Sequence, residues 1–211
     1  WTVGSLLVCV IVFLPIATVI TNLPGGSENW SHISQYLLPK YILSTMYLTF
    51  GVGIVSTIIG VGCAYMVTCY DFYGRRFVEW VLVLPMTIPT YIAAYSYYDA
   101  LELLTPLMLW SRRTLGADWT IAIENLIVYL IVMILFSFVL YPYIYITTRA
   151  SLILQGSRLI EAASMLGISS RRVLDKVILP LIRPAVIAGL SLVIMETLND
   201  YAAVEYFGIP T

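Results

Sequence analysis

The sequence predicts an all-α protein, a polytopic bundle of transmembrane helices. Of its 211 residues, 60% are hydrophobic and only 11% are charged, and the mean hydropathy is +0.91. A soluble domain, by contrast, has roughly a quarter of its residues charged. Five apolar stretches have about the 20 residues that an α-helix needs to cross a bilayer. We therefore expect about five spans in a single transmembrane domain, residues 1–211.

Polar or turn-forming segments separate the five predicted spans. The first span carries Pro15, which a membrane helix tolerates because neighbouring groups can satisfy the freed carbonyl. In the second span, Ser56, Gly60 and Ala64 recur every four residues, so that one smooth face lets another helix approach closely. The predicted spans are about 3–20, 41–70, 78–98, 121–145 and 185–201.

The third span contains two prolines and is followed by a group of tyrosines. Pro85 and Pro89, four residues apart, must distort this helix. One interpretation is a kinked helix that ends in an aromatic belt at the membrane interface. The other is unwound backbone that lines a transport path, and it makes Tyr95 a candidate residue of that path.

The distribution of Lys and Arg predicts the orientation in the membrane. Loops on the cytoplasmic side carry an excess of these residues, and one set of alternate connections holds eight of the eleven. That set, which we expect to be cytoplasmic, consists of Arg75, Arg76, Arg149, Arg158, Arg171, Arg172, Lys176 and Arg183. The start of the second span and the end of the fifth are then outside the cell.

Composition argues against several classes of function. The net charge of −1 gives no basic field for nucleic acid. The single histidine, His32, lies in a connection, so no Ser/His/Asp or Cys/His set can form within one membrane layer. We expect the three cysteines to serve packing, because their spacing suits neither a metal nor a redox motif. A membrane enzyme and a non-transporting sensor therefore remain only distant alternatives, and we predict no metal site.

The connection over residues 149–184 is basic and amphipathic and predicts a cytoplasmic helix–turn–helix. Apolar residues at helical spacing lead to Leu166, and Gly167 is placed to end this helix with a left-handed cap. A second helix is expected over 171–179 and is predicted to stop at Pro180. Such a hinged helix pair, joined directly to a membrane span, can transmit force.

The same connection carries a spaced motif. Its residues are Glu161, Ala162, Ala163 and Gly167 and, after nine further residues, Val177, Leu179 and Pro180. The pattern closely resembles the EAA loop of bacterial ABC importer permeases, with Val177 where that family usually has Ile. A fainter likeness over residues 84–95 and 195–210 resembles the ferric-iron permeases of the superfamily. The resemblance implies a type I importer permease fold, located as a multi-pass protein in the bacterial cytoplasmic (inner) membrane.

The resemblance also implies a role for the motif. The residues from Glu161 to Gly167 would form a coupling helix that docks in a groove of a separate ABC ATPase, a helix-in-groove mode of recognition. Ala162 and Ala163 would permit close approach, while Leu179 and Pro180 complete the motif. The alternative is a helix that only lies on the lipid surface.

The resemblance and the motifs together predict the partners. No Gly-Lys-Ser/Thr phosphate loop occurs in the sequence, so we expect no cofactor in this chain, with ATP and Mg bound by the partner ATPase. The other expected partners are an extracytoplasmic substrate-binding protein, lipid, and a second permease half or copy. Permeases of this kind commonly contain two halves with one EAA loop each, so we expect this chain to be one half or a trimmed copy.

Ferric iron is the cargo that the resemblance favours, with thiamine, polyamine and phosphonate as alternatives. Glu196 and Asp200 are spaced to share a helix face near the outer end of the fifth span, beside Asn199. Their oxygens suit a hard trivalent cation. The alternative for Asn199 and Asp200 is that they only end the helix at the interface.

Overall fold

A computed structural model shows a helical chain, with no strand among the residues that it describes. The described residues are 2–22, 33–102, 105–114, 116–156, 165 and 173–211. They divide into two compact units, Trp1–Tyr41 and Ile42–Thr211. The predicted all-α class is confirmed.

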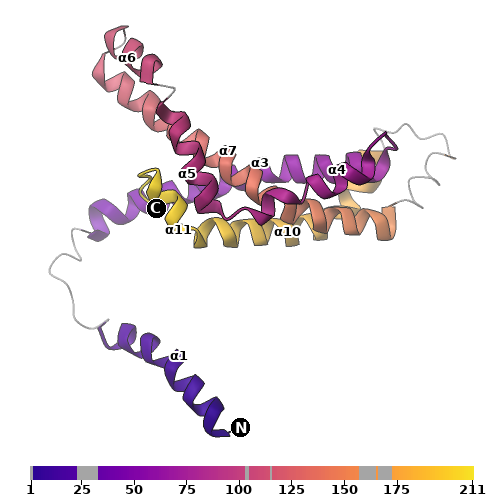
Figure 1. The fold of residues 1–211 in the computed structure, drawn as a ribbon, viewed down its shortest axis with the longest axis horizontal. Helices are drawn as coiled ribbons and strands as arrows, with labels where there is room; N and C mark the ends of the chain where they lie inside the picture. The colour runs from indigo at the N-terminus through magenta and orange to yellow at the C-terminus, as the bar shows by residue number, and fades with distance from the viewer. Residues whose placement is uncertain (1, 23–32, 103–104, 115, 157–164, 166–172) are drawn as a thin grey trace. The chain divides into compact units, whose positions relative to one another are not determined.

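The first unit contains α1 (Thr2–Asn22), the π-helical turn η1 (Ile33–Leu37) and the start of α3 (Leu38–Cys69). Helix α1 covers the predicted first span and has Pro15 inside it. Its apolar stretch, Cys9–Thr18, is shorter than a membrane span requires. The side chains described along α1 are mostly exposed, and Figure 1 shows this helix at the N-terminus of the chain.

Among the described residues, three helices are long and apolar enough to cross a membrane, or four if one bent helix pair counts as a single span. Besides α3 they are α7 (Ala117–Ser151) and α10 (Leu179–Asn199). They correspond to the second, fourth and fifth predicted spans, and each observed helix extends beyond at least one predicted end. The predicted number of five spans is therefore not reached within the described residues.

The predicted third span, residues 78–98, is broken rather than continuous. It consists of α4 (Arg75–Val81), the 3-10 turn η2 (Leu84–Thr87) and α5 (Thr90–Glu102). The parts before and after the break are bent by 88°. Pro85 is the second residue of η2. Ile88 is extended at φ −89° and ψ 118° just before Pro89, because proline disfavours helical backbone in the residue before it. The expected distortion at the two prolines is confirmed, while the lining of a transport path by this backbone stays a prediction.

Helices α3, α7 and α10 pack together as the core of the second unit, and Figure 1 shows them side by side. Gly60 makes the close approach possible: a Cβ there would lie 2.9 Å from Cβ of Ile144 on α7. The other two members of the small-residue stripe, Ser56 and Ala64, are also buried. The predicted close approach of another helix to this stripe is thus confirmed, and α7 is that helix.

Short helices complete the chain. Helix α6 (Thr105–Thr114) precedes α7, and α11 (Tyr201–Tyr206) follows α10. Helix α7 continues into the π-helical turn η3 (Leu152–Gly156), and η4 (Leu174–Ile178) leads directly into α10.

One prediction about this last junction is wrong: Pro180 does not stop a helix. The helix runs from Lys176 to Asn199 with Pro180 near the start of α10 and Pro184 inside it. A proline in the first turn of a helix is tolerated, because its missing N–H would lack an intrahelical partner there in any case.

Candidate coupling and translocation site

Helices α7 and α10 bracket the predicted coupling stretch. The motif residues Glu161, Ala162, Ala163 and Gly167 lie outside the described residues. Leu179 and Pro180 are described: both are exposed in the first turn of α10, directly after η4. The structure therefore defines the two stems of the loop, which are η3 and η4.

A buried apolar cluster holds the two stems together, and we call it the base cluster. It joins α7, both stems, α10 and α3, so that every long helix of the second unit contributes to it. Its buried members are Ala64, Tyr141, Tyr145, Leu152, Val173, Ile178 and Ile182. Close-packed side chains transmit strain to one another, and this cluster places both stems in contact with the three long helices.

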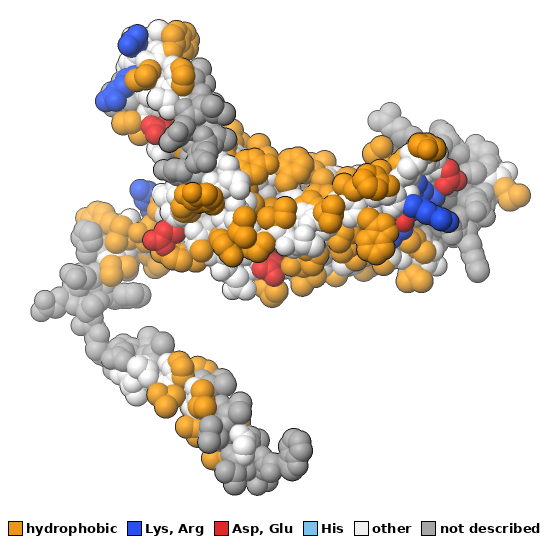
Figure 2. All heavy atoms as spheres, in the orientation of Figure 1, with side chains coloured by type: hydrophobic (Ala, Val, Ile, Leu, Met, Phe, Trp, Pro, Cys, Tyr) orange, Lys and Arg blue, Asp and Glu red, His pale blue; other side chains and the backbone are white. Residues whose placement is uncertain are grey.

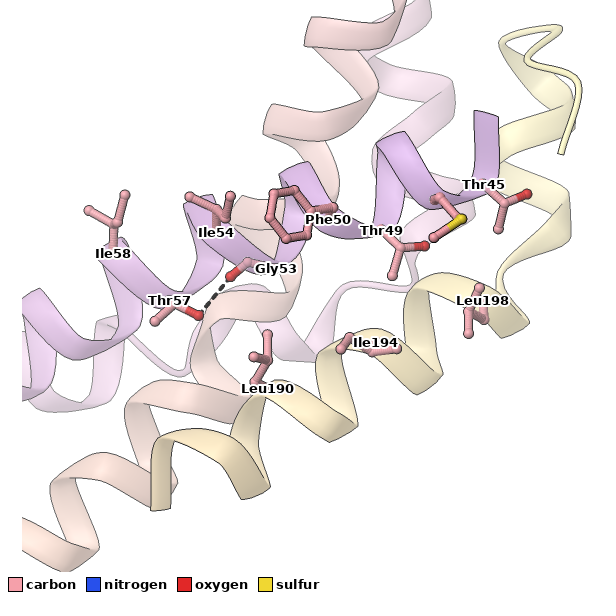
Figure 3. Close-up of a pocket in the computed structure, with 11 residues that line it drawn as sticks. Thr45, Thr49, Phe50, Gly53, Ile54, Thr57, Ile58, Leu190, Ile194 and Leu198 are labelled. Carbon is pink, nitrogen blue, oxygen red and sulfur yellow. Dashed lines mark hydrogen bonds between the residues drawn. The ribbon is translucent and has the colours of Figure 1, made fainter. Parts of the chain in front are cut away.

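A groove runs between α3 and α10 on the surface of the second unit. One part, of about 530 Å³, is lined along α3 by Thr45, Thr49 and Thr57 and along α10 by leucine and isoleucine side chains. Figure 3 shows the two helices facing each other across it, with the Thr57 hydroxyl donating to the Gly53 carbonyl at 2.6 Å. The buried Thr49 hydroxyl has no such partner, and apart from its threonines the groove is lined by apolar residues.

The groove continues towards the loop stems. A second part, of about 580 Å³, shares Thr57 and Ile58 with the first and reaches Leu179 and Arg183 near the start of α10. At the other end, a smaller hollow of about 180 Å³ shares Thr45 and Thr49 with the groove and reaches Asp200. A continuous line of hollows therefore joins the loop end of α10 to its far end.

The residues predicted for the translocation path differ from one another in the residues that they contact. Glu196 faces α7, where the Tyr143 hydroxyl donates to its Oε1 at 3.4 Å. Asp200 follows the end of α10 and caps α11, because its Oδ1 accepts from the Ala203 N–H at 3.2 Å. Asn199 is the exposed last residue of α10. Asp200 thus ends one helix and starts the next, besides lining the hollow beside α3.

Tyr95 lies on α5 rather than near α10. Its ring is 6.0 Å from the ring of Tyr206 on α11, and both rings line a hollow together with Tyr91. The Tyr95 side chain is 63% exposed. This placement fits an aromatic belt as readily as a path, so the path role of Tyr95 stays a prediction.

Among the residues that the structure describes, no three His, Cys, Asp or Glu side chains are close enough to hold a metal ion together. The carboxylates of Glu196 and Asp200 can offer oxygen atoms to a passing cation, but each is engaged by a protein donor.

The second unit thus combines long apolar helices, an open groove between two of them, and two loop stems packed against all three. Residues 56–211 match the family described as binding-protein-dependent transport system inner membrane component. The chain belongs to this family, the inner-membrane permeases of ABC importers. The predicted family and fold class are confirmed.

Relatives with assigned transport systems are similar over most of this chain. The sulfate transport system permease protein CysT of Escherichia coli (strain K12) is 27% identical over 205 residues, 95% of this chain and 71% of the relative. The spermidine/putrescine transport system permease protein PotC of Haemophilus influenzae is 27% identical over 201 residues, covering 90% and 71%. The molybdenum transport system permease protein ModB of Haemophilus influenzae is 26% identical over 173 residues, covering 78% and 71%. None of these three names mentions iron, so the likeness to ferric-iron permeases stays a prediction.

Proposed function

We propose that the chain is the permease subunit of an ATP-driven importer in the bacterial inner membrane, where it moves cargo by alternating access. The base cluster is the observation that carries this proposal. It fastens both stems of the EAA-type loop to α3 and α10, the two helices that form the groove. A partner ATPase that binds ATP and Mg and pulls on the loop would therefore change the groove directly. This chain itself is a transport subunit, and hydrolysis belongs to the partner.

The groove needs a second wall before it can serve as a path. It is open along its length, and its exposed rim carries large apolar side chains such as Phe50, Ile54 and Ile58. We propose that a second permease half or copy covers this side and that an extracytoplasmic binding protein delivers cargo to the far end. Residues 1–211 would then act as one permease domain, and Asp200 and Arg183 would mark the two ends of the path.

For the cargo, we propose ferric iron as the first candidate. The carboxylates of Glu196 and Asp200 near the far end of α10 support a cation, because hard cations favour oxygen ligands. The name of PotC, a spermidine/putrescine permease, also fits a cationic cargo. The second candidate is an oxyanion. The names of CysT and ModB support it, as does Arg183 on the groove.

Uptake by the complete transporter tests both parts of the proposal. Vesicles that contain the full permease, its ATPase and its binding protein would be offered labelled ferric iron, spermidine, sulfate or molybdate, each with and without ATP. We expect ATP-dependent accumulation of one cargo class. The absence of ATP-dependent uptake for every cargo, with all subunits present, would contradict the permease function, whereas uptake of an oxyanion alone would contradict iron.

A charge substitution at Glu196 tests the path. We expect Glu196→Gln to lower uptake of a cationic cargo about tenfold, which corresponds to roughly 1.4 kcal/mol in the barrier. Tyr143→Phe is the matched control, because it removes the hydrogen bond to Glu196 but leaves the charge; we expect a loss of less than about twofold. The initial uptake rates of both variants show whether the charge of Glu196 or its hydrogen bond is needed for transport. Equal losses in the two would assign Glu196 a packing role instead.

Asp200 allows its charge to be separated from its capping role. Asp200→Asn keeps an oxygen that can accept from the Ala203 N–H, so α11 should remain capped while the charge is lost. A reduced uptake of cation by this variant would place the carboxylate on the path. Wild-type uptake would reduce Asp200 to a helix cap.

A further inference from the structure

We propose that Glu79 is a positioning residue of the transport cycle. It fastens α4 to the end of α7, so that movement of the coupling loop reaches the bent segment α4–η2–α5. The inference rests on the proposed function, because it assigns a route for the force that the ATPase supplies.

Glu79 is held by cations from two helices. Its Oε2 is 2.8 Å from Nη2 of Arg149 on α7, and its Oε1 is 3.2 Å from Nε of Arg75 at the start of α4. The Glu79 and Arg149 side chains are 21% and 30% exposed, so solvent screens the pair only in part. Arg75 also pairs with Asp71 at 2.6 Å, but that carboxylate is 95% exposed. Charge-assisted hydrogen bonds are strong, and the pair of Glu79 with Arg149 is less exposed to solvent than the pair of Arg75 with Asp71.

Helix α4 depends on such polar ties because it has little packing of its own. None of its residues is buried, and Phe77 and Trp80 on its outer side are 73% and 78% exposed. Just beyond α4, the Tyr141 hydroxyl on α7 donates to the Leu82 carbonyl at 2.8 Å. The segment before the break is therefore held by two polar contacts with α7, one from Glu79 and one at Leu82, and by Leu82 and Val83 packed against the base cluster.

The position of Arg149 makes this tie relevant to coupling. Arg149 is in the last turn of α7, directly before the stem η3. Figure 2 shows charged side chains gathered at this end, near the start of α4, beside a largely hydrophobic middle. A shift of the stem is thus passed through Arg149 to Glu79 and α4 before it reaches the break at η2.

Beyond the break, the segment reaches the far end of the molecule. Helix α5 packs against both α7 and α11, with Tyr95 beside Tyr206. Helix α11 begins at the cap residue Asp200, which lines the hollow at the end of the groove. The tie at Glu79 therefore gives the coupling loop a second route to the far end, in addition to α10 itself.

The test measures uptake and ATP hydrolysis together in vesicles that contain the complete transporter with its ATPase and binding protein. We expect Glu79→Gln and Arg149→Gln each to lower uptake about fivefold while hydrolysis changes by less than about twofold, so that more ATP is consumed per cargo molecule. Arg149→Lys keeps a cation opposite Glu79 and should recover most of the uptake. The double variant Glu79→Gln/Arg149→Gln should be no worse than either single one, because residues of one pair are not additive.

Asp71→Asn is the matched control, because it removes the exposed ion pair of the same cluster and leaves Glu79 with Arg149. We expect it to retain the wild-type ratio of uptake to hydrolysis. An unchanged ratio in the Glu79 and Arg149 variants, or an equal change in the Asp71 variant, would overturn the inference. Failure of the wild-type complex to take up cargo with ATP would instead contradict the proposed function. Should Glu79→Gln fail to fold, Arg149→Gln against Arg149→Lys carries the same test.

Discussion

Glu161→Lys and Gly167→Leu are each expected to lower ATP-dependent uptake about a hundredfold and to release the ATPase from washed membranes. In the EAA-type pattern, Glu161 would meet a polar rim on the ATPase, and Gly167 would end the coupling helix with a backbone turn that a side chain disfavours. Residues central to an interface cost about 2–4 kcal/mol when replaced, and each 1.4 kcal/mol is tenfold in affinity. Co-sedimentation of the ATPase with membranes and the rate of uptake measure the two effects.

Lys176→Gln provides the control within the same loop. Lys176 is exposed on η4, at a position that the motif leaves free, so its variant should keep both the ATPase and the uptake. If the stretch were only a helix on the lipid surface, Glu161→Lys and Gly167→Leu would retain the ATPase as the control does. That result would remove the coupling role from the motif.

The sequence predicted the main helices because their signals are local and strong. Long apolar runs marked α3, α7 and α10, and the four-residue spacing of small side chains marked the close contact that Gly60 makes with Ile144. The partner helix could not be named in advance, because such a stripe fits any neighbour with a matching surface. The family also followed from a local motif, and the match over residues 56–211 confirms it.

Predictions that depended on a single proline were less reliable. Pro180 was expected to end a helix, yet it lies in the first turn of α10, where the missing N–H costs little. Pro85 and Pro89 predicted a distortion but gave no angle, since the 88° bend depends on what packs on each side of the break. The same residue type thus breaks one segment and opens another, according to its place in the helix.

The polar contacts of the site were the part that sequence could not supply. The spacing of Arg75 and Glu79 suggests a pair on one helix face, but the partner that matters, Arg149, is distant in sequence and meets Glu79 only in the fold. The sequence predicts two possible roles for Asp200, one on the path and one at the end of the helix. The structure adds a third use, the cap of α11, because the chain turns there.

Gly189→Leu is expected to abolish folding of the permease, and Gly189→Ala to destabilise it by about 1–3 kcal/mol, the usual cost of overpacking. A Cβ at Gly189 would lie 2.6 Å from Oγ1 of Thr147 and 2.7 Å from Cα of Ile144 on α7. The second of these is a backbone atom, so α7 and α10 would have to separate. Because α7 leads into the stem η3 and α10 begins at the stem η4, the same separation should also disturb coupling.

Two other glycines of the second unit serve as controls for this prediction. A Cβ at Gly53 would approach only the flexible end of Leu190, at 3.1 Å, and a Cβ at Gly62 would meet nothing within 4 Å. Melting of the purified variants in detergent should therefore rank Gly189→Ala lowest, Gly53→Ala close to the wild type, and Gly62→Ala unchanged or slightly higher, because alanine favours the helix. At roughly 2–4 °C per kcal/mol for a chain of this size, the Gly189 variant should melt several degrees below the others. Equal melting temperatures of all three variants would show that α7 and α10 can separate without loss of stability. The base cluster could then not transmit a movement of the loop to the groove.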